Sequence, residues 1–211
     1  MTEQKFNDNF ASNGDFSHNF RPSKWREAIE FVWETLKIAL ISLAIIIPVR
    51  YFLIQPFYVK GASMEPNFYD HEYLIIDEIT YRFADPKRGD IVVFKYPKNP
   101  SQYFIKRIIG LPGEQIKIMA GKVYLAQKDG QAEVLPEDYL PADLSTNLPM
   151  EGYSEVILGA DEYFLLGDNR DQSLDSRVFG PVKREFIVGR TWLRGWPFDR
   201  LTIFETPQYD L

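Results

Sequence analysis

The run YFIKRIIG, residues 103–110, has a lysine in the middle of an apolar segment of the kind that forms β-strands. Successive side chains of a strand point to opposite faces, so Phe104, Lys106 and Ile108 share one face. An ammonium group between two large apolar neighbours is costly, because burial disfavours the charged form. Either the amine of Lys106 extends to water or pairs with a carboxylate, or the fold uses it as a neutral base.

Short apolar runs of the same kind lie on both sides of this segment. They are EYLII, DIVVFKY, EQIKIM, KVYLA, DEYFLLG, EFIVGRTWLRG and LTIF, separated by Gly, Pro and Asp. Ala120-Gly121, between two of the runs, predicts a tight hairpin. Residues 127–152 contain three prolines and several acids and are interpreted as lying away from the core. The sequence thus predicts a mostly β domain of antiparallel sheets over residues 56–211, with a small inserted β subdomain at about 119–158.

The N-terminal part has a different composition. Residues 1–23 are polar and aperiodic, as is typical of a disordered tail. Residues 38–54, IALISLAIIIPVRYFLI, would span roughly 25 Å as a helix, and the apolar residues before them extend this toward the thickness of a bilayer core. We therefore predict one transmembrane helix within residues 24–55, in preference to a buried amphipathic helix.

A cleaved signal peptide is disfavoured, because the apolar run begins only at Ile38 and no small-residue cleavage pattern follows it. Most of the nearby basic residues precede or enter the run, among them Arg26 and Lys37, which predicts an N-terminus on the cytoplasmic side. Arg50 and Tyr51, at the far end, suit the membrane interface.

The composition excludes several classes of function. A net charge of -6 argues against a general nucleic-acid-binding protein. The absence of cysteine excludes disulfides and thiolate sites, and the two histidines, His18 and His71, lie in polar segments. We therefore expect no metal, no cofactor and no serine-histidine pair.

The stretch VKGASMEPNF, residues 59–68, supplies a candidate nucleophile. Ser63 lies in a loop whose backbone Gly61 and Pro66 shape. Alone it is an ordinary loop serine, but a neutral Lys106 could accept the proton of its hydroxyl. Arg107 could not, since a guanidinium group does not deprotonate in proteins.

A third stretch, GDNRDQSLDSRVFGP at residues 167–181, combines charges of both signs. The charged residues considered are Asp168, Arg170, Asp171, Asp175 and Arg177. Their alternation predicts pairing within the loop, which would hold it rigid. A calcium loop starting at Asp168 fails, because Arg170, Ser173 and Phe179 occupy positions that need an oxygen ligand, glycine and glutamate. The hydroxyl of Ser173 could orient a neutral lysine.

Together these motifs resemble type I signal peptidases, membrane-bound serine-lysine endopeptidases. The matching pieces, in order, are the apolar segment, GASMEP at 61–66, RGDIVVF at 88–94, KRIIGLPGE at 106–114, and GDNRDQSLDSRVFGP. The resemblance covers most of residues 36–194. It is specific because several independent motifs occur together, whereas SMxP alone would be weak.

The resemblance implies roles for individual residues. Ser63 matches the nucleophile, Lys106 the general base, and Ser173 the residue that orients the lysine. The charged positions that brace the site are matched by Asp168, Arg170, Asp175 and Arg177. Positions lining the substrate pockets are matched by Phe57, Val59, Met64 and Ile105. Some relatives have an oxyanion-binding serine where this chain has Gly61, so the backbone N–H of Ser63 is expected to carry more of that role.

The implied function is cleavage of N-terminal signal peptides from exported preproteins, after small residues at the first and third positions before the cut. Expected partners are these preproteins and the lipid bilayer, without nucleic acid. The expected location is a single-pass membrane protein whose catalytic domain faces the periplasm, the cell exterior or a thylakoid lumen. Two alternatives stay open: a self-cleaving serine-lysine protein of the repressor type, and a non-enzymatic membrane-tethered β module.

Overall fold

The structure is a computed structural model that describes residues 24–48, 54–126, 132–149, 152, 154–207 and 209. The expected tail at 1–23 and the expected interfacial residues Arg50 and Tyr51 lie outside these ranges. The chain divides into two compact units, Met1–Ile45 and Ile46–Leu211.

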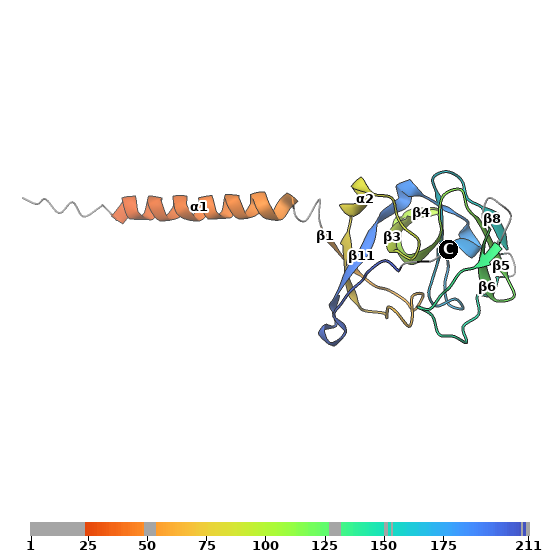
Figure 1. Cartoon of the computed structure of the whole chain (residues 1–211). Helices are drawn as coiled ribbons and strands as arrows, with labels where there is room; N and C mark the ends of the chain where they lie inside the picture. Colours follow the sequence, from red (N-terminus) through yellow and green to blue (C-terminus); the bar gives the residue numbers. More distant parts are fainter. Residues whose placement is uncertain are drawn as a thin grey trace, which may run out of the picture. The chain divides into compact units, whose positions relative to one another are not determined.

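The first unit contains a single described helix, α1, which runs over Lys24–Pro48 into the start of the second unit (Figure 1). None of its residues is buried, and it is long and apolar enough to cross a membrane. At about 1.5 Å per residue, its 25 residues exceed the roughly 30 Å of a hydrocarbon core. Its length and apolar composition fit a membrane anchor.

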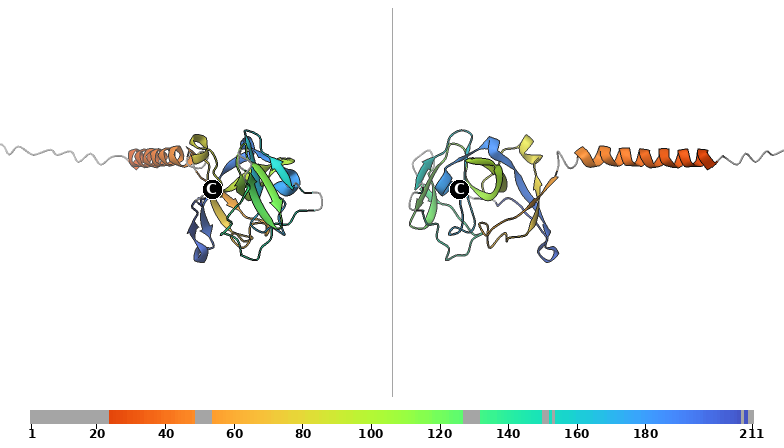
Figure 2. Two further views of the ribbon diagram at one scale, coloured as in Figure 1. Left: turned by 45° about the vertical axis from the view of Figure 1, so that its right-hand side comes forward. Right: turned by 180° about the vertical axis from the view of Figure 1, so that it is seen from behind.

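The second unit is built mainly from two antiparallel sheets (Figures 1 and 2). The strands of the larger sheet are β1 (Ile54–Tyr58), β2 (Tyr73–Asp77), β3 (Ile91–Tyr96), β4 (Asn99–Gly110), β9 (Glu162–Leu166), β10 (Val182–Lys183), β11 (Ile187–Trp196) and β12 (Thr202–Ile203). Their order is β1-β2-β11-β3-β4-β9-β10, with β12 paired to β11. The predicted mostly β, antiparallel fold is confirmed.

The smaller sheet has the order β7-β6-β5-β8 and lies in the chain between β4 and β9. Its strands are β5 (Gln115–Met119), β6 (Lys122–Ala126), β7 (Ala132–Val134) and β8 (Glu155–Ile157). In Figures 1 and 2 its green strands lie at the opposite side of this unit from β1. The predicted hairpin is present: Ala120 and Gly121, both with positive φ, join β5 to β6.

Short helices complete this unit. They are α2 (Thr80–Phe83), α3 (Ser176–Phe179), η2 (Arg184–Phe186) and η3 (Phe198–Arg200). Strand β1 was not predicted, because its sequence IQPFY contains a proline. It lies at the edge of the larger sheet, where a strand tolerates proline because one row of its backbone groups needs no partner.

Strand β3 is the centre of the hydrophobic core. Ile91 and Val93 pack with Met64 and Phe68 in one cluster, whereas the alternate residues of the strand pack in a second cluster with Ile108. Burial on both faces explains why IVVF is apolar without interruption. In the pairing of β3 with β4, Val92 lies opposite Lys106. The sheet thus brings Lys106 into the buried part of the molecule.

Gly189 allows β11 to lie close against β2. A Cβ at Gly189 would be 2.6 Å from the carbonyl oxygen of Asp77, whereas one at Gly195 in the same strand would have only the carbonyl oxygen of Tyr73, at 3.9 Å, nearby. We expect Gly189→Ala to lower the free energy of unfolding by about 1–3 kcal/mol, because the added methyl group forces the backbone to shift.

Urea unfolding of the full chain in detergent, followed by tryptophan fluorescence, measures this effect. Gly195→Ala is the matched control and should leave the midpoint nearly unchanged. Equal midpoints for the two variants would contradict the packing of β11 described above.

Candidate active site

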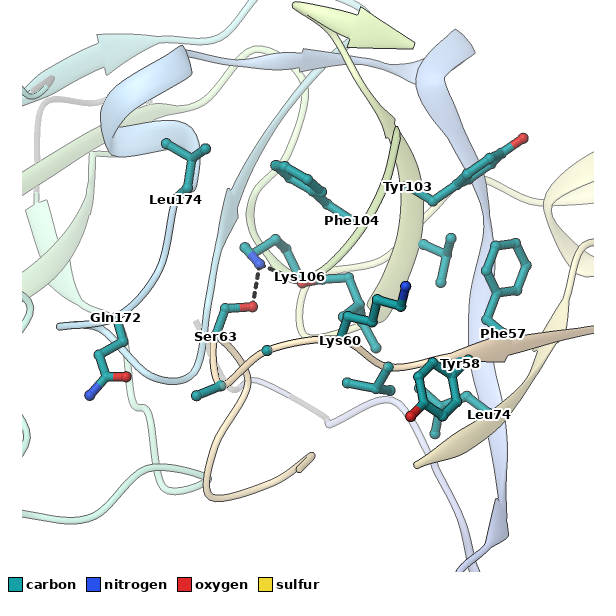
Figure 3. Close-up of a pocket in the computed structure, with 15 residues that line it drawn as sticks. Phe57, Tyr58, Lys60, Ser63, Leu74, Tyr103, Phe104, Lys106, Gln172 and Leu174 are labelled. Carbon is teal, nitrogen blue, oxygen red and sulfur yellow. Dashed lines mark hydrogen bonds between the residues drawn. The ribbon is translucent and has the colours of Figure 1, made fainter. Parts of the chain in front are cut away.

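Lys106 lies in the middle of β4 with its side chain almost completely buried, at 3% exposure. Its Nζ is 2.7 Å from Oγ of Ser63, within hydrogen-bond distance, and donates to the carbonyl oxygen of Ile105 at 2.8 Å (Figure 3). Of the alternatives for this lysine, extension of the side chain into bulk water does not agree with this burial. No carboxylate in the described part of the chain pairs with it directly.

Ser63 lies in the loop between β1 and β2, and this loop is fixed at several points. The backbone N–H of Phe68 donates to the carbonyl of Met64 at 2.8 Å, and both side chains are buried. The carbonyl of Ser63 accepts a hydrogen bond from the N–H of Asn169 at 3.1 Å. The loop that carries the hydroxyl is thus joined directly to the charged segment at 167–181.

Gly61 adopts a φ of +90°, the left-handed region that glycine tolerates best. Its N–H donates to a carboxylate oxygen of Asp70 at 3.0 Å. A Cβ here would meet no atom within 4 Å, so the requirement for glycine is conformational rather than steric. A serine at this position would adopt the observed backbone conformation only with strain.

The pKa of Lys106 is lowered to about 8, chiefly by burial; Asp175 and Asp168 offset part of this effect, and Arg177 adds to it. The usual pKa of lysine is about 10.4. At pH 7, roughly one amine in ten is neutral when the pKa is about 8, compared with fewer than about one in a thousand when it is about 10.4. This site can therefore supply a neutral amine beside a serine hydroxyl.

Arg107, the residue after Lys106, points to the opposite face of β4 and forms a buried pair with Asp168. Its Nε and Nη2 donate to the two carboxylate oxygens at 2.8 and 2.7 Å. Asp168 also accepts from the side-chain amide of Asn67 at 2.8 Å, and the guanidinium carbon lies 3.9 Å from the ring centroid of Tyr139. The pair thus connects β4, the Ser63 loop and the charged segment.

The prediction that the charges of residues 167–181 pair within their own loop is wrong for Asp168 and for Arg170. Only Asp175 and Arg177 pair inside the loop, at 2.8 Å. Asp168 pairs with Arg107 of β4, and Arg170 pairs with Glu137 from the segment before β8. Tertiary structure brings these partners together from distant parts of the chain, so alternation along the sequence could not reveal them.

Arg177 is buried, and each of its three guanidinium nitrogens has an acceptor. Besides Asp175, it donates to the carbonyl oxygens of Arg170 at 2.6 Å and Asn147 at 2.7 Å. Asp175 caps α3 through the N–H of Arg177 and accepts from the N–H of Gly167 at 3.1 Å. These bonds tie the loop together at several points, partly through residues outside the loop.

Ser173 lies close to the site without bonding to Lys106. A Cβ on Gly167 would be 2.1 Å from Oγ of Ser173 and 2.5 Å from the carbonyl oxygen of Ser63, so only glycine allows these segments to approach. Oγ of Ser173 is buried and makes no hydrogen bond within the described residues. Besides its contact with Ser63, the Lys106 amine donates to the carbonyl of Ile105.

A cleft of about 350 Å³ opens beside Ser63 and Lys106. Of the predicted pocket residues, Phe57, Val59 and Ile105 line it, whereas Met64 is buried in the core at 1% exposure. Figure 3 shows Phe57 and Tyr103 on one side of the serine and lysine, and Gln172 and Leu174 on the other. Tyr103 also lines the cleft and was not among the predicted pocket residues, although it is two residues before Ile105 on the same face of the strand.

No group of three or more acidic, histidine or cysteine side chains in the described part of the chain could hold a metal ion.

Comparison with known proteins identifies the family. The model of the family described as signal peptidase, peptidase S26, matches residues 32–196. A probable signal peptidase I-2 of Synechocystis sp. is 39% identical over 178 residues, which cover 82% of this chain and 77% of that protein. A signal peptidase I of Leptolyngbya laminosa is 36% identical, covering 80% and 81%.

Among solved structures, a signal peptidase I from Enterococcus faecalis V583 is 33% identical with a TM-score of 0.41, and the match covers 51% of this chain and 97% of that one. Since the family model extends over most of the chain and the relatives exceed 30% identity across about four fifths of it, the chain belongs to the signal peptidase family, peptidase S26.

Proposed function

We propose that this protein is a membrane-anchored serine endopeptidase that removes signal peptides from exported preproteins, with Ser63 as the nucleophile and Lys106 as the general base. The contact of 2.7 Å between the hydroxyl and a buried amine of lowered pKa carries the proposal. Membership of the signal peptidase family supports the substrate class.

In the proposed reaction, Oγ of Ser63 attacks the carbonyl carbon of the scissile peptide while Lys106 accepts the hydroxyl proton. The lysine then returns that proton to the leaving amine, and the new N-terminus departs. A water molecule, deprotonated by the same amine, attacks the acyl carbonyl; the bond to Oγ of Ser63 breaks, and the lysine returns the proton to Oγ. The N–H of Ser63 is proposed to bind the oxyanion. Gly61 has no side chain that could add a second hydrogen bond.

The pairs around the dyad are proposed to fix its geometry. Asp168 with Arg107, and Asp175 with Arg177, hold the segment that contacts the carbonyl of Ser63. Arg170 donates to the carbonyl of Gly167 at 3.0 Å and so holds the glycine that both serines approach. Ser173 is proposed to orient the amine when substrate is bound, its unpaired hydroxyl being available for that bond.

The edge of β4 offers a place for an extended substrate. Residues 103–105 pair with β3 on one side, but pairing with β9 begins only at Arg107. Among the described strands, none covers the other edge of residues 103–105, which faces the cleft. A peptide could add to this edge by backbone hydrogen bonds. Its small side chains at the first and third positions before the cut would then lie against Phe57, Val59 and Ile105.

The two alternative functions fit the structure less well. A repressor-type protein would have a DNA-binding region where this chain has the apolar helix α1. In a non-enzymatic module, Lys106 would face solvent or pair with a carboxylate, whereas it is buried against a serine hydroxyl. We further propose a cytoplasmic N-terminus and a catalytic unit on the export side of the membrane, where signal peptides emerge.

The dyad is tested by removing either member. We expect Ser63→Ala and Lys106→Ala each to lower the rate of cleavage of a precursor with an Ala-x-Ala signal by at least about 10³-fold, and the double variant to be no worse, because the two groups act as a unit. The purified full chain in detergent is assayed by gel. Lys95→Ala, an exposed lysine of β3, is the control. Undiminished cleavage by either dyad variant would refute the assignment.

The pH dependence tests the protonation state of the base. Only the neutral amine accepts a proton, and its pKa is lowered to about 8, so activity should rise with pH. We expect kcat/KM to increase about tenfold per pH unit below 7 and to level off above about 8.5. A profile that is flat between pH 6 and pH 9 would contradict a lysine base.

Ser173→Ala tests the orienting role. Loss of one hydrogen bond to the amine should lower kcat about fivefold to tenfold, which is far less than loss of either dyad member. It should also move the midpoint of the pH profile, which a purely structural change would leave in place. Ser101→Ala, at an exposed position, is the control. A variant with the wild-type kcat and midpoint would eliminate this role for Ser173.

A further inference from the structure

Within the part of the chain that the structure describes, the side chains that line the cleft beside the dyad include cations but no acids. Among the described residues that line it, the charged ones are two lysines, Lys60 and Lys106, and there is no aspartate or glutamate. Lys106 is buried, with a lowered pKa, whereas Lys60 is exposed. An exposed lysine is charged at neutral pH, so Lys60 provides the permanent charge of the cleft.

Lys60 follows β1 on the outward side of the alternating pattern. Phe57 and Val59 are partly or fully buried, while Tyr58 and Lys60 are exposed. Figure 3 shows the side chain of Lys60 extending over the cleft, with its ammonium between Ser63 and Phe57. The inward residues of this segment thus form apolar walls, and Lys60 places a cation at the mouth.

The ammonium of Lys60 makes no hydrogen bond or ion pair with any residue that the structure describes. Asp70, an acid of the same loop, accepts from the N–H groups of Gly61 and His71, at 3.0 and 3.1 Å, and lies 3.3 Å from Nδ1 of His71. Lys60 is therefore free to meet a charge on the substrate.

An extended peptide alternates in the same way as the strand that it joins. If its side chains at the first and third positions before the cut point inward, the side chain between them points outward, toward the side that carries Lys60. A carboxylate at this middle position would lie near the ammonium, and a cation there would be repelled.

From this geometry we propose that Lys60 is a specificity-determining residue that favours preproteins with aspartate or glutamate at the second position before the cut. The proposal rests on the proposed signal-peptide cleavage. It adds a charge preference that the small-residue rule does not contain.

The test compares three precursors that differ only at this position, with Ala-Glu-Ala, Ala-Gln-Ala and Ala-Lys-Ala before the cut. For the full chain in detergent at low salt, we expect kcat/KM for the glutamate precursor to exceed that for the glutamine precursor by about twofold to fivefold, with the lysine precursor slowest. Lys60→Gln should remove the preference and Lys60→Glu should reverse it. About 1 M salt should weaken it in the wild type.

Lys122→Glu is the matched control, since it makes the same charge change at an exposed position of the smaller sheet. It should retain the wild-type preference. Equal rates for the three precursors in the wild type, or an unchanged preference in Lys60→Glu, would overturn the role of Lys60 alone. Failure of the wild type to cut the glutamine precursor would overturn the proposed function, and this proposal with it.

Discussion

Burial of the Lys106 amine beside the hydroxyl of Ser63 is the constraint on which this site depends. A pKa of about 8 in the folded chain, against about 10.4 in the unfolded chain, corresponds to about 3 kcal/mol of lost stability at pH 7. The unfolded chain binds the proton more tightly, so this contribution to stability improves as the pH rises from about 8 to about 10. A small domain has only about 5–15 kcal/mol of net stability, so burial of the Lys106 amine costs a large share of it. Such a cost is consistent with a functional role for the amine.

The ion pairs around Lys106 limit how far nearby carboxylates raise its pKa. Asp168 and Asp175 each favour a protonated lysine and so oppose the effect of burial. Each receives two hydrogen bonds from an arginine, Arg107 and Arg177 respectively. Buried pairs of this kind add little to stability. Their value here lies in fixing the loop while limiting the negative potential at the amine.

The fold was largely predictable, because alternating apolar runs and turn residues indicate antiparallel strands directly. The burial of Lys106 was predictable for the same reason, since its position in the alternation placed it among apolar neighbours. Ser63 was identified as the candidate nucleophile from the GASMEP motif. Strand β1 was missed because Pro56 is tolerated only at an edge, and the position of an edge is a property of the whole sheet. The partners of Asp168 and Arg170 were missed because they come from residues 61 and 33 positions away in sequence.

The most direct test of this account is the titration of Lys106 itself. Selective ¹³C labelling of lysine, with the signal assigned by its absence in Lys106→Arg, allows the pKa to be read by NMR from the Cε shift in the full chain. The account expects a midpoint near pH 8. A midpoint near 10.4, the ordinary value for a solvated lysine, would show that the amine is not held in the neutral-favouring site on which the proposed chemistry rests.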